Sequence, residues 1–154
     1  MKKIKFKLKS GQIDFTHARW APVVNCVLSY KGKILLVQRS STLNFYPGYW
    51  NGVSGFLDDH RSLQEKVVDE VGEEVGIPKT KIKSIVCGEI FHQDAPKYKK
   101  TWIVHPVLVE VATDDVTLDW EAGAYKWVTV RDAKHLKLMP GFKRVLEKLY
   151  KKHT

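Results

Sequence analysis

Three glutamates in the middle of this chain of 154 residues are its most suggestive chemical group. Glu70, Glu73 and Glu74 stand at positions i, i+3 and i+4, and residues three and four apart share one face of a helix. Carboxylates held this close repel one another unless a positive charge lies among them. Oxygen ligands of this kind suit Mg²⁺ or Mn²⁺, which keep several waters and bridge to substrate phosphates. The spacing therefore predicts a divalent metal site and phosphate chemistry.

The alternative interpretation of the three glutamates is an acidic helix face exposed to solvent. Acidic groups near the C-terminus of a helix oppose its macrodipole, so the cluster is locally unfavourable. A local cost without an evident structural gain favours a functional role.

The helix that must carry these glutamates has clear signals at both ends. Ser62 and Glu65 form an S-x-x-E capping box at its start, and Gly76 followed by Pro78 marks its end. Its apolar stripe should pack on a sheet and consists of Leu63, Val67, Val68, Val71 and Val75. The carboxylates lie beside that stripe, at the edge of the buried face.

Strand-like segments surround this helix. Residues 3–8 alternate lysine with apolar side chains, and residues 23–30 and 33–38 flank Lys31-Gly32 as a predicted hairpin. Further apolar runs cover residues 82–91, 101–111 and 125–130, and an amphipathic helix is expected over residues 141–150. This order predicts an α/β fold of the α+β type with a mixed sheet between helices, in a single domain over residues 1–154.

The segment 55–77 resembles the Nudix box of MutT-like proteins, G-x5-E-x7-R-E-U-x-E-E-x-G-U, where U is aliphatic. The matching positions are Gly55, Glu70, Val71, Glu73, Glu74, Gly76 and Ile77. Segments 33–39 and 50–55 look like the strand and the tryptophan-glycine entry that precede the box in this family. The resemblance implies an α/β/α sandwich and hydrolysis of a nucleoside diphosphate linked to another moiety.

Two positions depart from the box. Arg61 stands where the family has a glutamate, and Asp69 stands where it has an arginine. Because the exchange is reciprocal in charge, we expect a reversed ion pair between Arg61 and Asp69. In the family the arginine is thought to orient the next glutamate, so its loss predicts slower turnover without abolishing it.

The resemblance also suggests catalytic roles for four acidic residues. Glu70 and Glu74 are the expected direct metal ligands, and Glu73 is a third ligand or a base. Glu121 looks like the late acidic residue that some Nudix enzymes use as a further ligand or base.

Three more residues are candidates for substrate binding. Gly55 would let the backbone approach the metal or a phosphate. Arg39 could reach a phosphate or form a surface ion pair, and Trp50 could stack a base or belong to the core.

Two other functions remain open beside the metal-dependent hydrolase. A catalytically weak or inactive module that binds a nucleotide or RNA is favoured by the Arg61/Asp69 exchange. An isoprenoid-diphosphate isomerase is a different reaction on a related fold. Its chemistry uses a cysteine and a glutamate, whereas Cys26 and Cys87 both lie in strand-like runs.

The net charge of +9 could attract a nucleotide or RNA, or it could belong to a solvated surface that guards an edge strand. Lysines cluster at 3–9, 97–100 and 143–152. The first of these segments could pair across the subunits of a homodimer.

Both cysteines are expected as buried hydrophobic residues in a reducing compartment rather than as a disulfide. The chain start lacks the apolar region of a signal peptide, and no segment approaches transmembrane length. We therefore expect a cytoplasmic protein without a membrane partner.

Overall fold

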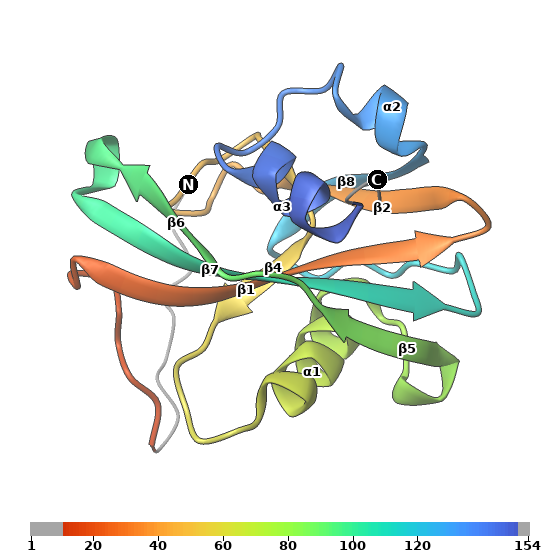
Figure 1. The fold of residues 1–154 in the computed structure, drawn as a ribbon, viewed down its shortest axis with the longest axis horizontal. Helices are drawn as coiled ribbons and strands as arrows, with labels where there is room; N and C mark the ends of the chain where they lie inside the picture. The colour runs from red at the N-terminus through yellow and green to blue at the C-terminus, as the bar shows by residue number, and fades with distance from the viewer. Residues whose placement is uncertain (1–10, 151–154) are drawn as a thin grey trace.

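The computed structural model describes residues 11–150 and is organised around one mixed sheet (Figure 1). The strands are β1 (Trp20–Tyr30), β2 (Lys33–Arg39), β3 (Trp50–Asn51), β4 (Val53–Phe56), β5 (Ile82–Cys87), β6 (Phe91–Ala95), β7 (Lys100–Val111) and β8 (Ala122–Val128). The helices are α1 (Leu63–Val75), α2 (Val130–Ala133) and α3 (Phe142–Leu149), with short 3-10 turns η1 (Lys79–Lys81) and η2 (Pro96–Tyr98). The strand predicted over residues 3–8 lies outside the described residues.

A parallel pairing of β1 with β7 forms the centre of the sheet. Residues 20–29 run beside residues 101–110, with Val24 opposite His105. The remaining pairings are antiparallel: β2 and β4 with β1, β5 and β6 with β7, and β3 and β8 with β2. This mixture confirms the predicted α/β fold with a mixed sheet.

Helices cover both faces of the sheet. Figure 1 shows α1 on one side and α2 with α3 on the other. The core on the α1 side includes the fully buried Val67, Val71 and Val75, and the opposite core includes Phe142 and Trp102. The arrangement is the expected α/β/α sandwich, because each helix buries one apolar stripe against the sheet.

The hairpin between β1 and β2 was predicted correctly. Lys31 and Gly32 have φ values of 47° and 79°, and Tyr30 pairs with Lys33 across the turn. Two consecutive residues with positive φ are typical of the tight turn whose twist matches that of paired strands.

Two strand predictions need correction. The run over residues 82–91 is two strands rather than one, although both pair with β7. Cys87 lies opposite Val107 and Phe91 opposite Val104, so the segment between the strands holds one residue more than β7 and the regular pairing is interrupted there. The last strand ends at Val128 instead of residue 130, because Thr129 caps α2 by accepting from the N–H of Asp132 at 3.1 Å.

Cys26 is buried as expected, but the prediction of a buried Cys87 is wrong. β5 lies at the edge of the sheet, and Val86 and Cys87 are exposed there. Both cysteines are free thiols.

Lys100 does not belong to a surface cluster as the sequence suggested. Its side chain is 1% exposed, and its ammonium donates to the carbonyls of Phe15 and Ala18. It also lies 5.6 Å and 5.7 Å from the ring centroids of Phe45 and Trp102. A buried ammonium needs such partners, so Lys100 fastens the segment before β1 to the sheet.

Over residues 11–150, none of the helices is long and apolar enough to cross a membrane.

Candidate functional site

Helix α1 has the ends that the sequence predicted. Ser62 accepts a hydrogen bond from the N–H of Glu65 at 3.1 Å, and Gly76 ends the helix at a φ of 69° with its N–H donating to Gly72. The Glu65 carboxylate accepts from the Ser62 hydroxyl at 3.1 Å instead of from a backbone N–H, so the capping box is only half formed.

Four residues of the predicted apolar stripe hold α1 against the sheet. Val67, Val71 and Val75 are fully buried, and Leu63 packs at the edge of the same core. Val68 is only partly buried and borders a shallow surface depression with Gln64 and Ile82. The stripe therefore fixes the rotation of α1 and with it the direction of the glutamates.

The three glutamates of α1 differ sharply in burial. Glu74 is 4% exposed and its Oε2 atom has no hydrogen-bond partner. The Glu70 side chain is 15% exposed, whereas Glu73 is exposed. Burial raises the pKa of Glu70 and Glu74, and for Glu74 the neighbouring charges of Glu121 and Glu70 raise it further. A buried carboxylate oxygen without a partner is costly, and a bound cation would satisfy it.

Glu121 joins this group from the segment before β8. The N–H of Asp119 donates to the Glu74 carbonyl at 3.1 Å, and the N–H of Ser40 donates to the Glu121 carbonyl at 2.8 Å. Burial, followed by the charges of Asp119 and Glu70, raises the pKa of Glu121 to about 7. The structure therefore brings Glu121 to the glutamates of α1, and it adds Asp119, which the sequence analysis missed.

Gly55 lies directly against Glu70. A Cβ atom at this position would lie 2.6 Å from Glu70 Cδ, closer than real Cβ atoms approach. The absent side chain therefore leaves the space that the Glu70 carboxylate fills.

The two other predicted substrate contacts have different surroundings. Arg39 donates through Nε to the carbonyl of Phe45 at 2.9 Å rather than to a surface carboxylate. Burial lowers the pKa of Arg39, and the charges of Glu74 and Glu121 oppose that shift. Trp50 is 9% exposed in the core on the opposite face from α1, under the ammonium of Lys126. Its position fits the core alternative, because a buried indole offers little surface for stacking a base.

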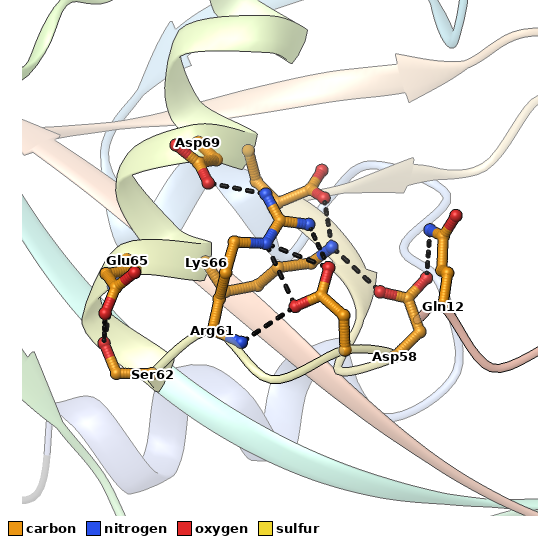
Figure 2. Close-up of polar contacts among 9 residues, drawn as sticks. Gln12, Asp58, Arg61, Ser62, Glu65, Lys66 and Asp69 are labelled. Atoms are coloured by element: carbon orange, nitrogen blue, oxygen red, sulfur yellow. Dashed lines mark hydrogen bonds and ion pairs between the residues drawn. The ribbon is translucent and has the colours of Figure 1, made fainter. Parts of the chain in front are cut away.

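The reversed ion pair between Arg61 and Asp69 is confirmed. Arg61 Nη1 lies 2.5 Å from Asp69 Oδ2, and the same guanidinium binds Asp59, with Nη2 2.6 Å from Oδ2 (Figure 2). Arg61 thus joins the loop before α1 to the second turn of the helix.

Lys66 is a second residue of this site that the sequence analysis overlooked, after Asp119. Its Nζ atom lies 3.1 Å from Asp58 Oδ1 and 3.2 Å from Glu70 Oε1. Asp58 in turn accepts from Gln12 Nε2 at 2.7 Å. The sequence did contain a signal for Lys66, namely its spacing from Glu70. A lysine four residues before a glutamate lies on the same face of a helix.

The donor chemistry of the site fits a hard divalent cation. All candidate donors are carboxylate oxygens, and the unpartnered Oε2 of Glu74 lies among them. Within the described part of the chain, however, no group of three or more His, Cys, Asp or Glu side chains is arranged so that it could hold a metal ion.

The sandwich fold, with an acidic helix packed against the strand that carries Gly55, is the architecture expected of a Nudix domain. A family model described as the NUDIX domain matches residues 19–149, and the chain therefore belongs to the NUDIX family.

Known proteins agree with this assignment. An uncharacterized Nudix hydrolase of Bacillus subtilis, YvcI, is 26% identical over 131 residues, covering 84% of this chain and 78% of the relative. The Ap4A hydrolase of C. elegans, solved as a binary complex, has a TM-score of 0.66 at 23% identity, covering 86% and 95% of the two chains. The NUDIX domain of Shewanella oneidensis NrtR, solved with ADP ribose, has a TM-score of 0.67 at 17% identity, covering 84% and 86%. The protein is a Nudix-type pyrophosphohydrolase.

Proposed function

We propose that this protein hydrolyses a phosphoanhydride bond of a nucleoside diphosphate linked to another moiety, using Mg²⁺ or Mn²⁺. The observation that carries the proposal is the buried Oε2 atom of Glu74, which has no hydrogen-bond partner. Burial raises the pKa of Glu74, and Glu121 and Glu70 lie close enough for their negative charges to raise it further. Such a group of buried carboxylates is unfavourable in the metal-free protein and becomes favourable when a cation is bound among them.

The acidic residues divide the work according to their surroundings. The buried Glu70 and Glu74 would hold the cation, and the exposed Glu73 would bind from the solvent side or act as a base. Glu121 is a candidate base because burial and the charges of Asp119 and Glu70 raise its pKa in the metal-free protein to about 7, which makes it a better proton acceptor than an ordinary carboxylate. When bound, the metal supplies charge neutralisation at phosphate oxygens and a more acidic water.

Arg39 is the candidate phosphate contact. Its guanidinium lies close enough to Glu74 and Glu121 for their charges to oppose the lowering of its pKa by burial. A guanidinium can bind a phosphate in bidentate fashion, so Arg39 would help to hold the substrate against the carboxylates.

The substrate class that we propose is a nucleotide. The solved relatives include an Ap4A hydrolase and a domain solved with ADP ribose, which supports ligands of this kind. We propose further that the chain acts as a single domain over residues 1–154.

The two other functions receive less support. A binding module without catalysis is favoured only by the Arg61–Asp69 pair. An isomerase would need an accessible thiol beside the glutamates, but Cys26, whose pKa is raised first by burial and then by Glu70 and Glu74, is completely buried. The exposed Cys87 lies on the edge strand β5, not on the elements that carry the glutamates.

The test is the release of phosphate or mononucleotide from nucleoside triphosphates, nucleotide sugars and dinucleoside polyphosphates, with Mg²⁺, Mn²⁺ or a chelator. Wild type is compared with Glu70→Gln and Glu74→Gln, and Glu110→Gln is the control because Glu110 is an exposed glutamate on β7. We expect metal-dependent turnover that both site variants lose and the control keeps. A wild type that binds Mn²⁺ and nucleotide without any turnover would support the binding module instead.

A further inference from the structure

We propose that Lys66 is a positioning residue for Glu70, because its ammonium contacts the Glu70 carboxylate. This inference rests on the proposed function, because the orientation matters for a carboxylate that binds the metal. The role is assigned to a side chain outside the defined positions of the box.

The first argument is the ion-pair network around the Lys66 ammonium. Figure 2 shows the side chain of Lys66 extended between α1 and the loop that carries Asp58. The Nζ atom bridges Asp58 Oδ1 at 3.1 Å and Glu70 Oε1 at 3.2 Å. An ammonium placed between two carboxylates holds both of them in fixed orientations.

The second argument is burial. The side chains of Lys66, Asp58 and Glu70 are 5%, 6% and 15% exposed. Lysine is almost never fully buried unless it is paired. A buried, charged lysine is far more restrained than a lysine at the surface.

The third argument is that the two exchanged residues are engaged elsewhere. Arg61 forms ion pairs with Asp59 and Asp69. Asp69, which precedes Glu70 in the chain, is an acid and is itself paired with Arg61. The cation that contacts Glu70 comes instead from one helical turn earlier, since positions i and i+4 are neighbours on a helix.

Glu70 is confined from both sides by this arrangement. Lys66 contacts its Oε1 atom, and the backbone of Gly55 leaves no room for a Cβ beside its carboxyl group. A carboxylate has a second oxygen for another partner. Lys66 therefore limits the orientations of Glu70 and leaves one oxygen for the metal.

The competing interpretation is that Lys66 only competes with the cation. The two interpretations predict opposite changes in metal affinity. Removing a positioning residue weakens Mn²⁺ binding, because the carboxylate must be ordered at the moment of binding. Removing a competing charge strengthens binding, because one repulsive interaction disappears.

The experiment uses the full chain with Lys66→Met, Lys66→Gln and Lys66→Arg. Lys83→Met is the matched control, since Lys83 pairs with Glu110 at 3.4 Å on an exposed part of the sheet. Calorimetry measures the Kd for Mn²⁺ alone, and kinetics measure kcat and KM on the best substrate of the panel. Thermal unfolding checks that each variant is folded.

We expect Lys66→Met to weaken Mn²⁺ binding and to lower kcat, each by about 10- to 100-fold, the range usual for partners that orient metal ligands. KM should change little, Lys66→Arg should recover part of the loss, and Lys83→Met should match wild type. If Lys66→Met does not fold, Lys66→Gln decides, with a loss in the same direction expected because the neutral amide also removes the ammonium from Glu70.

Tighter Mn²⁺ binding in Lys66→Met, or in Lys66→Gln if Lys66→Met does not fold, overturns the inference in favour of competition. Unchanged Kd and kcat with lower thermal stability overturn it in favour of a purely structural ion pair. A wild type without Mn²⁺ binding and without turnover overturns the proposed function together with this inference. If wild type is active and Lys66→Met has the same Mn²⁺ affinity and kcat, the inference is overturned and the proposed function stands.

Discussion

The buried Glu74 carboxylate is expected to lower the stability of the metal-free protein while it serves as a metal ligand. It is 4% exposed, its Oε2 atom has no partner, and burial raises its pKa. We expect Glu74→Gln to raise the melting temperature of the metal-free protein, because a neutral amide costs less to bury than a carboxylate.

Differential scanning calorimetry with and without Mn²⁺ tests this prediction. Mn²⁺ should raise the melting temperature of wild type, since a ligand of the native state stabilises it, and should leave Glu74→Gln unchanged. A metal-free Glu74→Gln protein that melts below wild type would show that the carboxylate already has a stabilising partner.

The acidic cluster also makes the metal-free protein sensitive to pH. The pKa of Glu121 is raised from 4.5 to about 7, by burial and then by Asp119 and Glu70, while Arg39 opposes the shift. The native state therefore binds more protons than the unfolded state over that interval. Its stability should be greatest near about pH 5 and should fall as the pH rises to about 8.

Urea unfolding in a chelator at about pH 5.5 and about pH 8 measures this trend, and Glu121→Gln should flatten it. Mn²⁺ should weaken the trend as well, because the metal binds deprotonated carboxylates. A metal-free stability that rises over this interval would contradict the raised pKa.

The residue chemistry could be predicted from the sequence only in part. The i, i+3, i+4 spacing of the glutamates and the reciprocal charges of Arg61 and Asp69 indicated which groups meet. Lys66 was missed because a lysine on a helix usually reaches solvent, and its burial depends on Asp58 from another element. Trp50 shows the same limit, because which sheet face a strand residue joins depends on distant pairings.

At the scale of elements, the contact between β4 and α1 decides whether Glu70 has room. Gly55→Ala would place a Cβ 2.6 Å from Glu70 Cδ, whereas Gly72→Ala would place one 3.9 Å from its nearest neighbour, the Ile77 carbonyl. We expect Gly55→Ala to weaken Mn²⁺ binding and turnover by displacing Glu70. We expect Gly72→Ala to stabilise the protein by about 0.5–1 kcal/mol, the usual gain of alanine over glycine inside a helix.

Mn²⁺ titration and urea unfolding of the two variants form a matched pair. The same methyl group is added once between two elements and once on an exposed helix surface. Equal metal affinity in wild type and Gly55→Ala would show that Glu70 can shift without consequence.

Some boundaries of helices and turns could be predicted from the local sequence alone. The turn at Lys31-Gly32, the cap at Ser62 and the stop at Gly76 were all predicted because a few neighbouring residues determine them. The division of residues 82–91 into β5 and β6, and the exposure of Cys87, were not. Both depend on how this segment pairs with β7, which is a long-range interaction that no local pattern encodes.

At the scale of the whole molecule, the net charge of +9 should act on substrate capture. A positive protein attracts an anionic nucleotide, and salt screens that attraction. We expect kcat/KM to fall severalfold between roughly 20 mM and roughly 300 mM KCl, with kcat nearly constant. A salt-independent kcat/KM would mean that the lysines are a solvated surface only.

The parallel pairing of β1 with β7 has a consequence for how the chain folds. It joins residues 20–29 to residues 101–110, and the acidic helix lies within the loop that this pairing closes. Closing so long a loop is entropically costly, which makes such topologies slow to fold. We expect the carboxylates to assemble only after that barrier, so that in stopped-flow experiments Mn²⁺ would slow unfolding and leave the refolding rate almost unchanged.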